Sequence, residues 1–523
     1  MKIYAAQINP TVGDISGNAE KIIAHIKSAE KSGADIAVFP ELAIAGYPPE
    51  DLLLRPSFIT EEQAALKKIA AASKKISVII GATFTDKTGL HNAAWHLSKG
   101  KAVVVSAKAD LPNYGVFDEK RYFKPSDLLK TITIKGKKVA VIVCEDSWTS
   151  AQTARYKKSK PDLFVVINAS PFETGKLKAR QAVIKKRVTE SKADFIYVNL
   201  IGGQDGIVFD GGSFAMNKTG KITASLPQFE ESGTIFKTLT PKLDKHEELY
   251  KTTLLGLRDY VTKNGFKKVL LGLSGGVDSA LVATIAVDAL GKENVRLVVL
   301  PTRFTSKTTY DDAYQICKNL GIKPEQIDIE PAFKAFEQML AKNFEGSKPG
   351  LAEENLQSRI RGTVLMAISN KHNEMLLTTG NKSEIAVGYT TLYGDSCGGY
   401  NPIKDLYKTE VYEICHWRNQ QGEIIPKNIL TKAPTAELRE NQTDQDSLPP
   451  YDVLDKILKL LIEQRKSVKE ITAKGFPKEI VEKVAKLLYR AEYKRFQSAP
   501  GAKLSLTAFG KDWRYPLTNK YNK

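Results

Sequence analysis

The sequence has little of several features that would identify other classes of protein. Four cysteines in 523 residues, with no CxxC pair, exclude a disulfide-rich secreted domain and a cysteine-based zinc site. No apolar run approaches the ~20 residues that span a bilayer. The start, MKIYAAQINP, lacks the long apolar segment of a secretory signal. We therefore expect a protein of the reducing cytoplasm without a membrane partner.

Positive charge is what the sequence has in excess. The 77 Lys+Arg against 59 Asp+Glu leave a net charge of +18. The surplus is spread over short runs that predict solvated turns and helix faces, at residues 135–138, 157–160 and 185–187. No zinc-finger, RNA-recognition or basic-zipper pattern accompanies them. We therefore do not expect a nucleic-acid partner.

The pattern of apolar segments predicts two α/β domains, at residues 1–245 and 246–523. In the first, strands alternate with helical segments, with strands expected at residues 3–8, 35–39, 77–81, 102–106, 138–143, 163–167 and 195–200. In the second, strands are expected at residues 268–273, 295–301 and 374–378, followed by helices from 451 to about 494. The sequence shows no internal repeat and no low-complexity tract.

A glycine-rich loop follows the first strand of the second domain and opens a helix. Its sequence is SGGVDS, from Ser274 to Ser279. Adjacent glycines allow a sharp turn and a close approach to a ligand, and the helix N-terminus favours an anion. Asp278 beside a phosphate site indicates a divalent cation such as Mg²⁺. The alternative is an ordinary glycine-rich turn, and the loop lacks the Walker A pattern.

A second cluster of charged residues follows the strand at 374–378. Thr379 and Glu384 come first, then Asp395, and then Lys404 and Lys408. Acidic groups and lysines that follow a phosphate loop in this order are suited to a metal–triphosphate site.

Three chemically complementary residues lie at or just beyond strand ends of the first domain. Cys144 ends the strand at 138–143, Glu41 follows the strand at 35–39, and Lys108 follows the strand at 102–106. We expect them to meet at the same edge of one sheet. Glu41 is suited to be the general base, Cys144 the nucleophile that forms a thioester from an amide, and Lys108 the cation that stabilises the oxyanion. The six histidines show no HExxH pattern and are expected to be structural or surface residues.

Together these residues resemble the glutamine-dependent NAD⁺ synthetases over nearly the whole chain. The first half is similar to the nitrilase (carbon–nitrogen hydrolase) superfamily, with Glu41, Lys108 and Cys144 at its Glu-Lys-Cys triad. The stretches LPNYGVFDE at 111–119 and CEDSW at 144–148 are typical of the attached glutaminase domains. The resemblance implies a glutamine pocket lined by Tyr114, Glu119, Trp148, Ser170 and Lys176.

The second half resembles the synthetase domain of the ATP-pyrophosphatase superfamily. The resemblance implies that ATP binds at Ser274, Gly275, Gly276, Val277, Asp278, Ser279, Arg303, Thr379 and Lys408. It implies Mg²⁺ at Asp278, Glu384 and Thr435, and deamido-NAD⁺ near Asp395, Glu384 and Asn355. The implied folds are a nitrilase-like α-β-β-α sandwich and a doubly wound, Rossmann-like parallel sheet.

The resemblance implies two coupled reactions. Glutamine hydrolysis supplies ammonia, and ATP adenylates deamido-NAD⁺, which ammonia then converts to NAD⁺ with release of AMP. A protected passage for ammonia and a homo-oligomer, formed through the synthetase domains, are also implied. Two alternatives stay open: another amidotransferase with this ATP loop, such as a GMP-synthetase-like enzyme, and a basic scaffold that keeps the motifs as relics. The first normally uses a Cys-His-Glu triad, and no suitable histidine accompanies Cys144.

Overall fold

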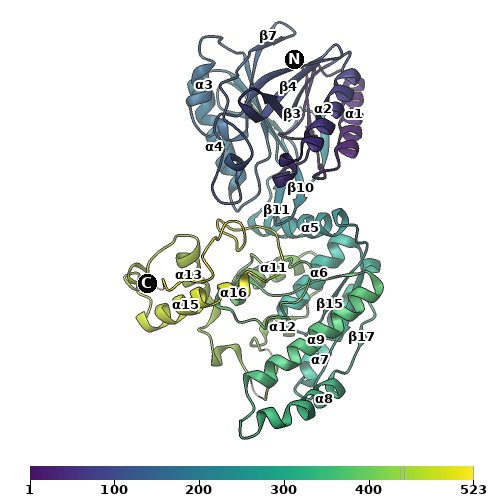
Figure 1. Ribbon diagram of the computed structural model, residues 1–523, viewed down its shortest axis with the longest axis vertical. Coiled ribbons are helices and arrows are strands. Elements are labelled where there is room, and N and C mark those ends of the chain that lie inside the picture. The colour runs from purple at the N-terminus through teal and green to yellow at the C-terminus, as the bar shows by residue number, and fades with distance from the viewer. Residues whose placement is uncertain (436, 441, 522–523) are drawn as a thin grey trace. The chain divides into compact units, whose positions relative to one another are not determined.

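The computed structural model describes residues 1–435, 437–440 and 442–521. The chain divides into two units, Met1–Leu243 and Asp244–Lys523, whose elements are coloured by residue number in Figure 1. The boundary expected after residue 245 lies two residues beyond this division. Helix α5 (Lys245–Lys263) opens the second unit, and its N-cap, Asp244, accepts hydrogen bonds from the backbone N–H groups of His246 and Glu247.

The first unit contains two six-stranded sheets. One has the order β14-β1-β2-β3-β4-β5, formed by β1 (Ile3–Gln7), β2 (Ile36–Val38), β3 (Ser77–Asp86), β4 (Gly89–Ser98), β5 (Lys101–Ala107) and β14 (Ser232–Ile235). The other has the order β13-β12-β9-β8-β7-β6, formed by β6 (Ile132–Ile134), β7 (Lys137–Val143), β8 (Leu163–Asn168), β9 (Asp194–Asn199), β12 (Phe214–Met216) and β13 (Ile222–Ser225). A separate hairpin pairs β10 (Ile201–Gln204) with β11 (Ile207–Asp210).

Helices cover the outer face of each sheet, so the unit has four layers (Figure 1). They are α1 (Ile15–Lys31) and α2 (Pro56–Ala72) on the first sheet, and α3 (Ala151–Arg155) and α4 (Lys176–Ser191) on the second. Short 3-10 helices occur at Glu50–Leu54 (η1), Glu119–Arg121 (η2) and Cys144–Ser147 (η3). The expected α-β-β-α sandwich is confirmed.

Strands that are buried on both faces explain the continuous apolar runs in the sequence. Every residue of β8, LFVVIN, is buried, as expected for parallel strands covered on both sides. Side chains of both sheets, among them Val38, Ile79, Val141 and Val165, form one core between them. On α1, Ile22, Ile26 and Ala29 follow helical spacing and pack onto the first sheet.

The second unit is built on a four-stranded parallel sheet with the order β17-β16-β15-β18. Its strands are β15 (Val269–Gly272), β16 (Val295–Val299), β17 (Glu325–Gln326) and β18 (Met375–Leu376). Its other helices are α6 (Val277–Leu290), η4 (Lys292–Asn294), α7 (Lys307–Leu320), α8 (Glu330–Leu340), η5 (Ala341–Phe344), α9 (Leu351–His372), α10 (Lys382–Val387), α11 (Lys408–Asn419), α12 (Lys427–Thr431), η6 (Asp444–Asp446), α13 (Tyr451–Ile462), α14 (Val468–Thr472), α15 (Lys478–Arg490) and α16 (Glu492–Arg495).

Helices pack on both faces of this sheet. Helix α6 contacts β15 and β16 and lies beside α5 and α11, whereas α9 contacts β15 and β18 and lies beside α8. The strand order reverses direction between β15 and β18, which places a crevice at the carboxyl ends of these two strands. The expected doubly wound α/β fold is confirmed. The C-terminal helices α13 to α15 share an apolar core with α10.

No helix in the part of the chain that the structure describes is long and apolar enough to cross a membrane.

A buried carboxyl group in the first unit makes its stability depend on pH. Glu62 on α2 is fully buried, where it accepts hydrogen bonds from the backbone N–H and the hydroxyl of Thr83. Burial raises the pKa of Glu62 to about 7. Because the folded protein then holds a proton that the unfolded chain releases at lower pH, stability falls as pH rises between about 4.5 and 7.

We expect Glu62→Gln to be more stable than the parent above pH 7, by up to about 3 kcal/mol, because the amide carries no charge to desolvate. The difference should shrink towards zero near pH 4.5. Thermal unfolding at several pH values checks this, with the exposed Glu61→Gln as control. An equal advantage for Glu62→Gln at pH 5 and pH 8 would contradict it.

Candidate functional site

The first unit buries a lysine between two carboxylates. The ammonium of Lys108, which follows β5, lies 2.7 Å from Glu41 Oε1 and 2.8 Å from Glu119 Oε1. All three side chains are almost completely buried. Burial opposes the charge of Lys108, but the carboxylates of Glu119 and Glu41 raise its pKa well above the usual value. A buried ion of this kind is stable only when it is paired.

Further hydrogen bonds fix the two carboxylates. Glu41 Oε1 accepts from Asn92 Nδ2 at 2.7 Å, and its Oε2 accepts from the backbone N–H of Ala169 at 2.8 Å. Glu119 Oε1 accepts from the Tyr47 hydroxyl at 2.7 Å. Each group that touches Lys108 is therefore held in place by a second partner, which preorganises the cluster.

Cys144 belongs to the same electrostatic cluster. Burial and the carboxylate of Glu41 raise the pKa of the Cys144 thiol well above the usual value, and Lys108 opposes them. Cys144 begins η3 directly after β7 with φ of 43°, a left-handed conformation that is strained for a side chain other than glycine. Strained residues of this kind gather at functional sites. The thiol is therefore protonated at rest and needs a base to react.

The expectation that these residues share one sheet was wrong. Glu41 and Lys108 follow β2 and β5 of the first sheet, whereas Cys144 follows β7 of the second. Because the two sheets pack face to face, strand ends from different sheets come within reach of one another.

The residues expected to bind glutamine lie around the turn after Cys144 or beside it. The hydroxyl of Tyr114 donates to Glu145, 3.0 Å away. The ammonium of Lys176 pairs with Glu173 at 3.0 Å and lies 4.9 Å from the ring centre of Trp148. Glu119 instead contacts Lys108 directly, as described above.

Ser170 is fixed by a buried arginine. Its hydroxyl accepts a hydrogen bond from Arg180 Nε at 3.0 Å, and Arg180 also forms a 2.7 Å ion pair with Asp210. Arg180 Nη2 also donates to the carbonyl oxygens of Ser170 and Pro171, next to Ala169, whose N–H donates to Glu41.

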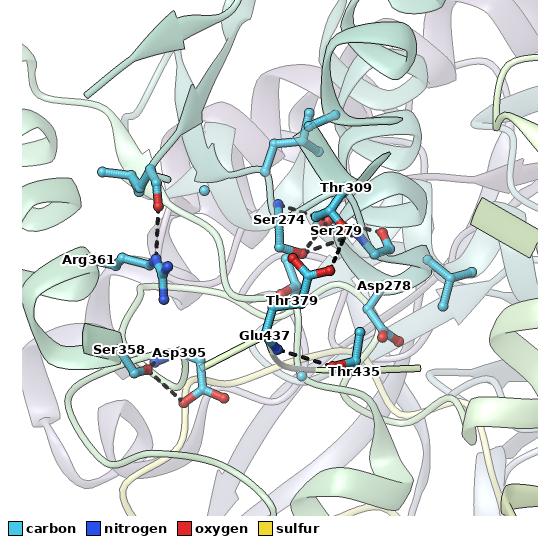
Figure 2. A pocket seen from close by; sticks show the side chains of 18 of the residues that line it. Ser274, Asp278, Ser279, Thr309, Ser358, Arg361, Thr379, Asp395, Thr435 and Glu437 are labelled. Atoms are coloured by element: carbon cyan, nitrogen blue, oxygen red, sulfur yellow. Dashed lines mark hydrogen bonds between the residues drawn. The ribbon is translucent and has the colours of Figure 1, made fainter. Parts of the chain in front are cut away.

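The second unit contains a cavity of about 320 Å³ at the carboxyl ends of β15 and β18. The loop Ser274–Ser279 forms one wall (Figure 2). Gly275 has φ of 77°, and a Cβ atom there would lie 2.3 Å from the carbonyl oxygen of Thr309. Glycine is therefore required at the turn, and the backbone leads directly into α6, whose N-terminus faces the cavity.

A second lysine lies between two carboxylates in this cavity. Lys408 Nζ is 2.5 Å from Asp278 Oδ2 and 3.2 Å from Glu384 Oε1. Asn381 donates to Asp278 Oδ1 at 3.0 Å. Burial raises the pKa of Glu384 to about 8, against the opposing charge of Lys408. Asp444, a third acid, accepts a hydrogen bond from the Tyr451 hydroxyl at 2.8 Å and lines the same cavity.

Negative groups outnumber positive ones along the cavity. Its described lining carries five carboxylates, Asp278, Glu384, Asp395, Glu437 and Asp444, and three cations, Arg361, Lys408 and Lys432. Thr379 and Thr435 also line it. These residues alone therefore give the cavity no surplus of positive charge for a phosphate chain.

Known proteins are similar to this chain in both sequence and fold. Residues 2–247 match the carbon-nitrogen hydrolase family and residues 249–498 the NAD synthase family. A glutamine-dependent NAD(+) synthetase of Xanthomonas campestris is 46% identical over 540 residues, covering 100% of this chain and 98% of the relative. One of Rhodobacter capsulatus is 45% identical, covering 99% and 98%. The chain belongs to the glutamine-dependent NAD(+) synthetases.

A solved structure of this family supports the assignment. The glutamine-dependent NAD⁺ synthetase of Acinetobacter baumannii, in complex with ADP, is 39% identical with a TM-score of 0.81, covering 99% of this chain and 98% of that one. The expected family is thus confirmed. The GMP-synthetase-like alternative is not supported.

Two of the expected ligand-binding residues lie apart from the cavity lining. Arg303 donates to Glu330 at 2.7 Å and to Glu337 at 3.1 Å. Asn355 accepts a hydrogen bond from the hydroxyl of Thr391 at 2.8 Å. The assignments of Arg303 to ATP and of Asn355 to the dinucleotide stay predictions.

Several residues that line the cavity or contact its lining were missed from the sequence. Asn381, Asp444, Glu437 and Arg361 all contact site residues or the cavity. Asn381 and Glu437 carried a usable signal, since Asn381 lies between Thr379 and Glu384 and Glu437 lies two residues after Thr435, in stretches already singled out. The others come from segments without a motif.

Replacing Lys108 tests the electrostatics around Cys144. We expect Lys108→Met to raise the pKa of the Cys144 thiol further, since Lys108 is the group that lowers it. Alkylation by iodoacetamide at pH 8 should slow at least about tenfold, the change that one pKa unit produces. Mass spectrometry of the Cys144 peptide gives the rate, and Lys176→Met is the matched control. Unchanged or faster alkylation of a folded Lys108→Met variant would refute the arrangement.

Proposed function

We propose that the chain makes NAD⁺ from deamido-NAD⁺, with ATP as co-substrate and glutamine as the nitrogen donor. The observation that carries the proposal is the pair of lysine-centred sites, one beside a strained cysteine and one beside a phosphate loop, in a chain of this family. We assign glutamine hydrolysis to residues 1–245 and the ATP-dependent step to residues 246–523.

In the first unit, Glu41 accepts the thiol proton as Cys144 attacks the amide carbon of glutamine. Lys108 stabilises the negative charge that develops on the carbonyl oxygen, in a site where the charge is poorly screened. The nitrogen takes that proton from Glu41 and leaves as ammonia, and the Glu41 carboxylate then activates the water that hydrolyses the thioester. Tyr114, Glu119, Trp148, Ser170 and Lys176 are the proposed surroundings of the glutamine.

In the second unit, the proposed ATP site comprises the loop from Ser274 to Ser279 with Thr379, Lys408 and Arg303. Asp395 and Asn355 are the proposed contacts of deamido-NAD⁺, with Glu384 beside them. Adenylation turns the nicotinate carboxylate, a poor electrophile, into an acyl phosphate that ammonia can attack.

A magnesium ion is part of the proposal, at Asp278, Glu384 and Thr435. The donors fit, because oxygen ligands are what Mg²⁺ prefers and the lining has more carboxylates than cations. The described residues alone include no group of three His, Cys, Asp or Glu side chains placed to hold a metal, so phosphate oxygens would complete the shell. When bound, Mg²⁺ offsets the negative charge of the triphosphate and of the leaving pyrophosphate.

A homo-oligomer in the cytoplasm is also part of the proposal. Apolar side chains on α8 and at the start of α9 are exposed, with Met339 70% and Leu351 73% accessible. Exposed apolar groups of this size are suited to a subunit contact. The free cysteines support this location, because thiols persist in a reducing compartment.

Replacing the cysteine should separate the two nitrogen sources. We expect Cys144→Ala to reduce glutamine-driven NAD⁺ formation at least about a thousandfold, as loss of a nucleophile does. NAD⁺ formation from ammonium should persist, since the second unit is unchanged. The measurement is NAD⁺ from deamido-NAD⁺, ATP and Mg²⁺ with each donor, and the buried Cys317→Ala is the control. Intact glutamine-driven synthesis in Cys144→Ala would exclude the thioester.

Replacing the phosphate-loop acid should abolish synthesis with either donor. We expect Asp278→Ala to lower NAD⁺ formation from glutamine and from ammonium alike, at least about a hundredfold, because Lys408 and the proposed metal lose a charged partner. Hydrolysis of glutamine, measured as glutamate, reports that the first unit remains folded. Asp311→Ala, an exposed acid on α7, is the control. A variant that still uses ammonium normally would place the ATP site elsewhere.

A further inference from the structure

Arg361 points a charged group into the cavity with little to hold it there. It lies on α9, and its Nε donates to the carbonyl oxygen of Leu300 at 3.0 Å. In the part of the chain that the structure describes, its two terminal nitrogens have no hydrogen-bond partner and no carboxylate within 4.0 Å. Figure 2 shows the guanidinium at the cavity wall.

The other two cations of the cavity are already neutralised. Lys408 is shared by Asp278 and Glu384, and Lys432 pairs with Glu437 at 3.3 Å. Glu437 also accepts hydrogen bonds from the hydroxyls of Ser306 and Thr309. Its negative charge acts on Arg361 only at a distance, without a direct contact. Among the described lining residues, Arg361 is the cation that still lacks an anion.

The side chain of Arg361 is partly buried, which makes the lack of an anionic partner significant. This burial lowers the pKa of Arg361 to about 10, so the guanidinium is still charged at neutral pH. A charge that is shielded from water and has no counter-ion is unfavourable. An anionic ligand in the cavity would remove this penalty, and the planar fork of two terminal nitrogens suits a phosphate.

The position of Arg361 lies between two parts of the site. Leu300 follows β16, next to the strand that leads into the phosphate loop. One helical turn earlier on α9, the hydroxyl of Ser358 accepts from the backbone N–H of Asp395 at 2.9 Å. A Cβ atom on Gly362 would lie 2.8 Å from the carbonyl oxygen of Tyr393, so this segment packs closely against α9.

We propose that Arg361 binds the α-phosphate of ATP and keeps hold of it in the adenylate. The inference rests on the proposed function. In the first step, an oxygen of the nicotinate carboxylate forms a bond to the α-phosphorus, and the bond from that phosphorus to pyrophosphate breaks, with the electron pair leaving on pyrophosphate. In the second, ammonia attacks the acyl carbon, the bond to AMP breaks with its electron pair on the AMP phosphate, and the nitrogen loses a proton. Arg361 stabilises the negative charge on the non-bridging oxygens through both steps.

Comparing AMP with adenosine isolates the contact, because the two ligands differ only in this phosphate. We expect the parent to bind AMP more tightly than adenosine in titration calorimetry. Arg361→Gln should weaken AMP binding about tenfold to a hundredfold and leave adenosine binding unchanged, the range for a lost charged hydrogen bond. The affinity of Arg361→Lys for AMP should lie between that of the parent and that of Arg361→Gln. Ammonium-driven turnover should fall in the same order.

Controls separate the outcomes. Lys371→Gln, an exposed cation at the end of the same helix, should bind both ligands as the parent does. Equal weakening of AMP and adenosine by Arg361→Gln would overturn the proposal in favour of a structural role. Unchanged AMP binding with a raised KM for deamido-NAD⁺ would overturn it in favour of the nicotinate carboxylate. Failure of the proposed function itself shows separately, as a parent protein that makes no NAD⁺ from ammonium.

Discussion

Each unit of this chain buries one lysine between two carboxylates, and the chemistry of each site depends on how the remaining negative charge is handled. Lys108 lies between Glu41 and Glu119, and Lys408 lies between Asp278 and Glu384. A buried ion pair is held by partners on every side, and removing one partner costs about 3–5 kcal/mol. With one lysine for two carboxylates, each cluster lacks one positive charge.

The two units meet this shortage differently. In the first, protons supply the missing charge: burial raises the pKa of Glu119, and the Cys144 thiol stays protonated. The charges of this site are thereby balanced without a ligand, and the Cys144 thiol keeps a proton that Glu41 can accept. In the second, burial likewise raises the pKa of Glu384 to about 8, so a proton balances the charge at rest, and the open cavity allows a cation that arrives with the substrates to replace that proton. A site of this kind favours an anionic substrate that arrives together with a cation.

Local patterns were enough to predict most of the architecture and the main residues of both sites. The sandwich and the parallel sheet follow from alternating strands and helices, and the phosphate loop from two glycines at a strand-to-helix junction. Cys144, Glu41 and Lys108 could be singled out because each follows a strand. What the sequence could not show was which sheet each strand joins, since pairing between distant segments leaves no local mark. That is why one sheet was expected for residues that come from two.

The same limit explains Arg361 and Arg303. The family resemblance singled out Arg303 for ATP and passed over Arg361. Only the packing shows that Arg303 is held by Glu330 and Glu337, while Arg361 meets a single backbone carbonyl. A cation that is available to bind a ligand is recognised because it has no carboxylate partner within the protein. Only the folded structure shows which cations are unpaired in this way.

The overall charge of +18 is a poor guide to either site for this reason. Most lysines of the chain are exposed, whereas the cavity that is to hold ATP is lined by five carboxylates and three cations. The long-range field of the surface draws anions towards the protein and is weakened by salt. Inside the cavity, screening is small and each charge acts on its neighbours. Binding there is decided by three cations, two of which are already taken, so the position of the third determines which phosphate the site can hold most firmly.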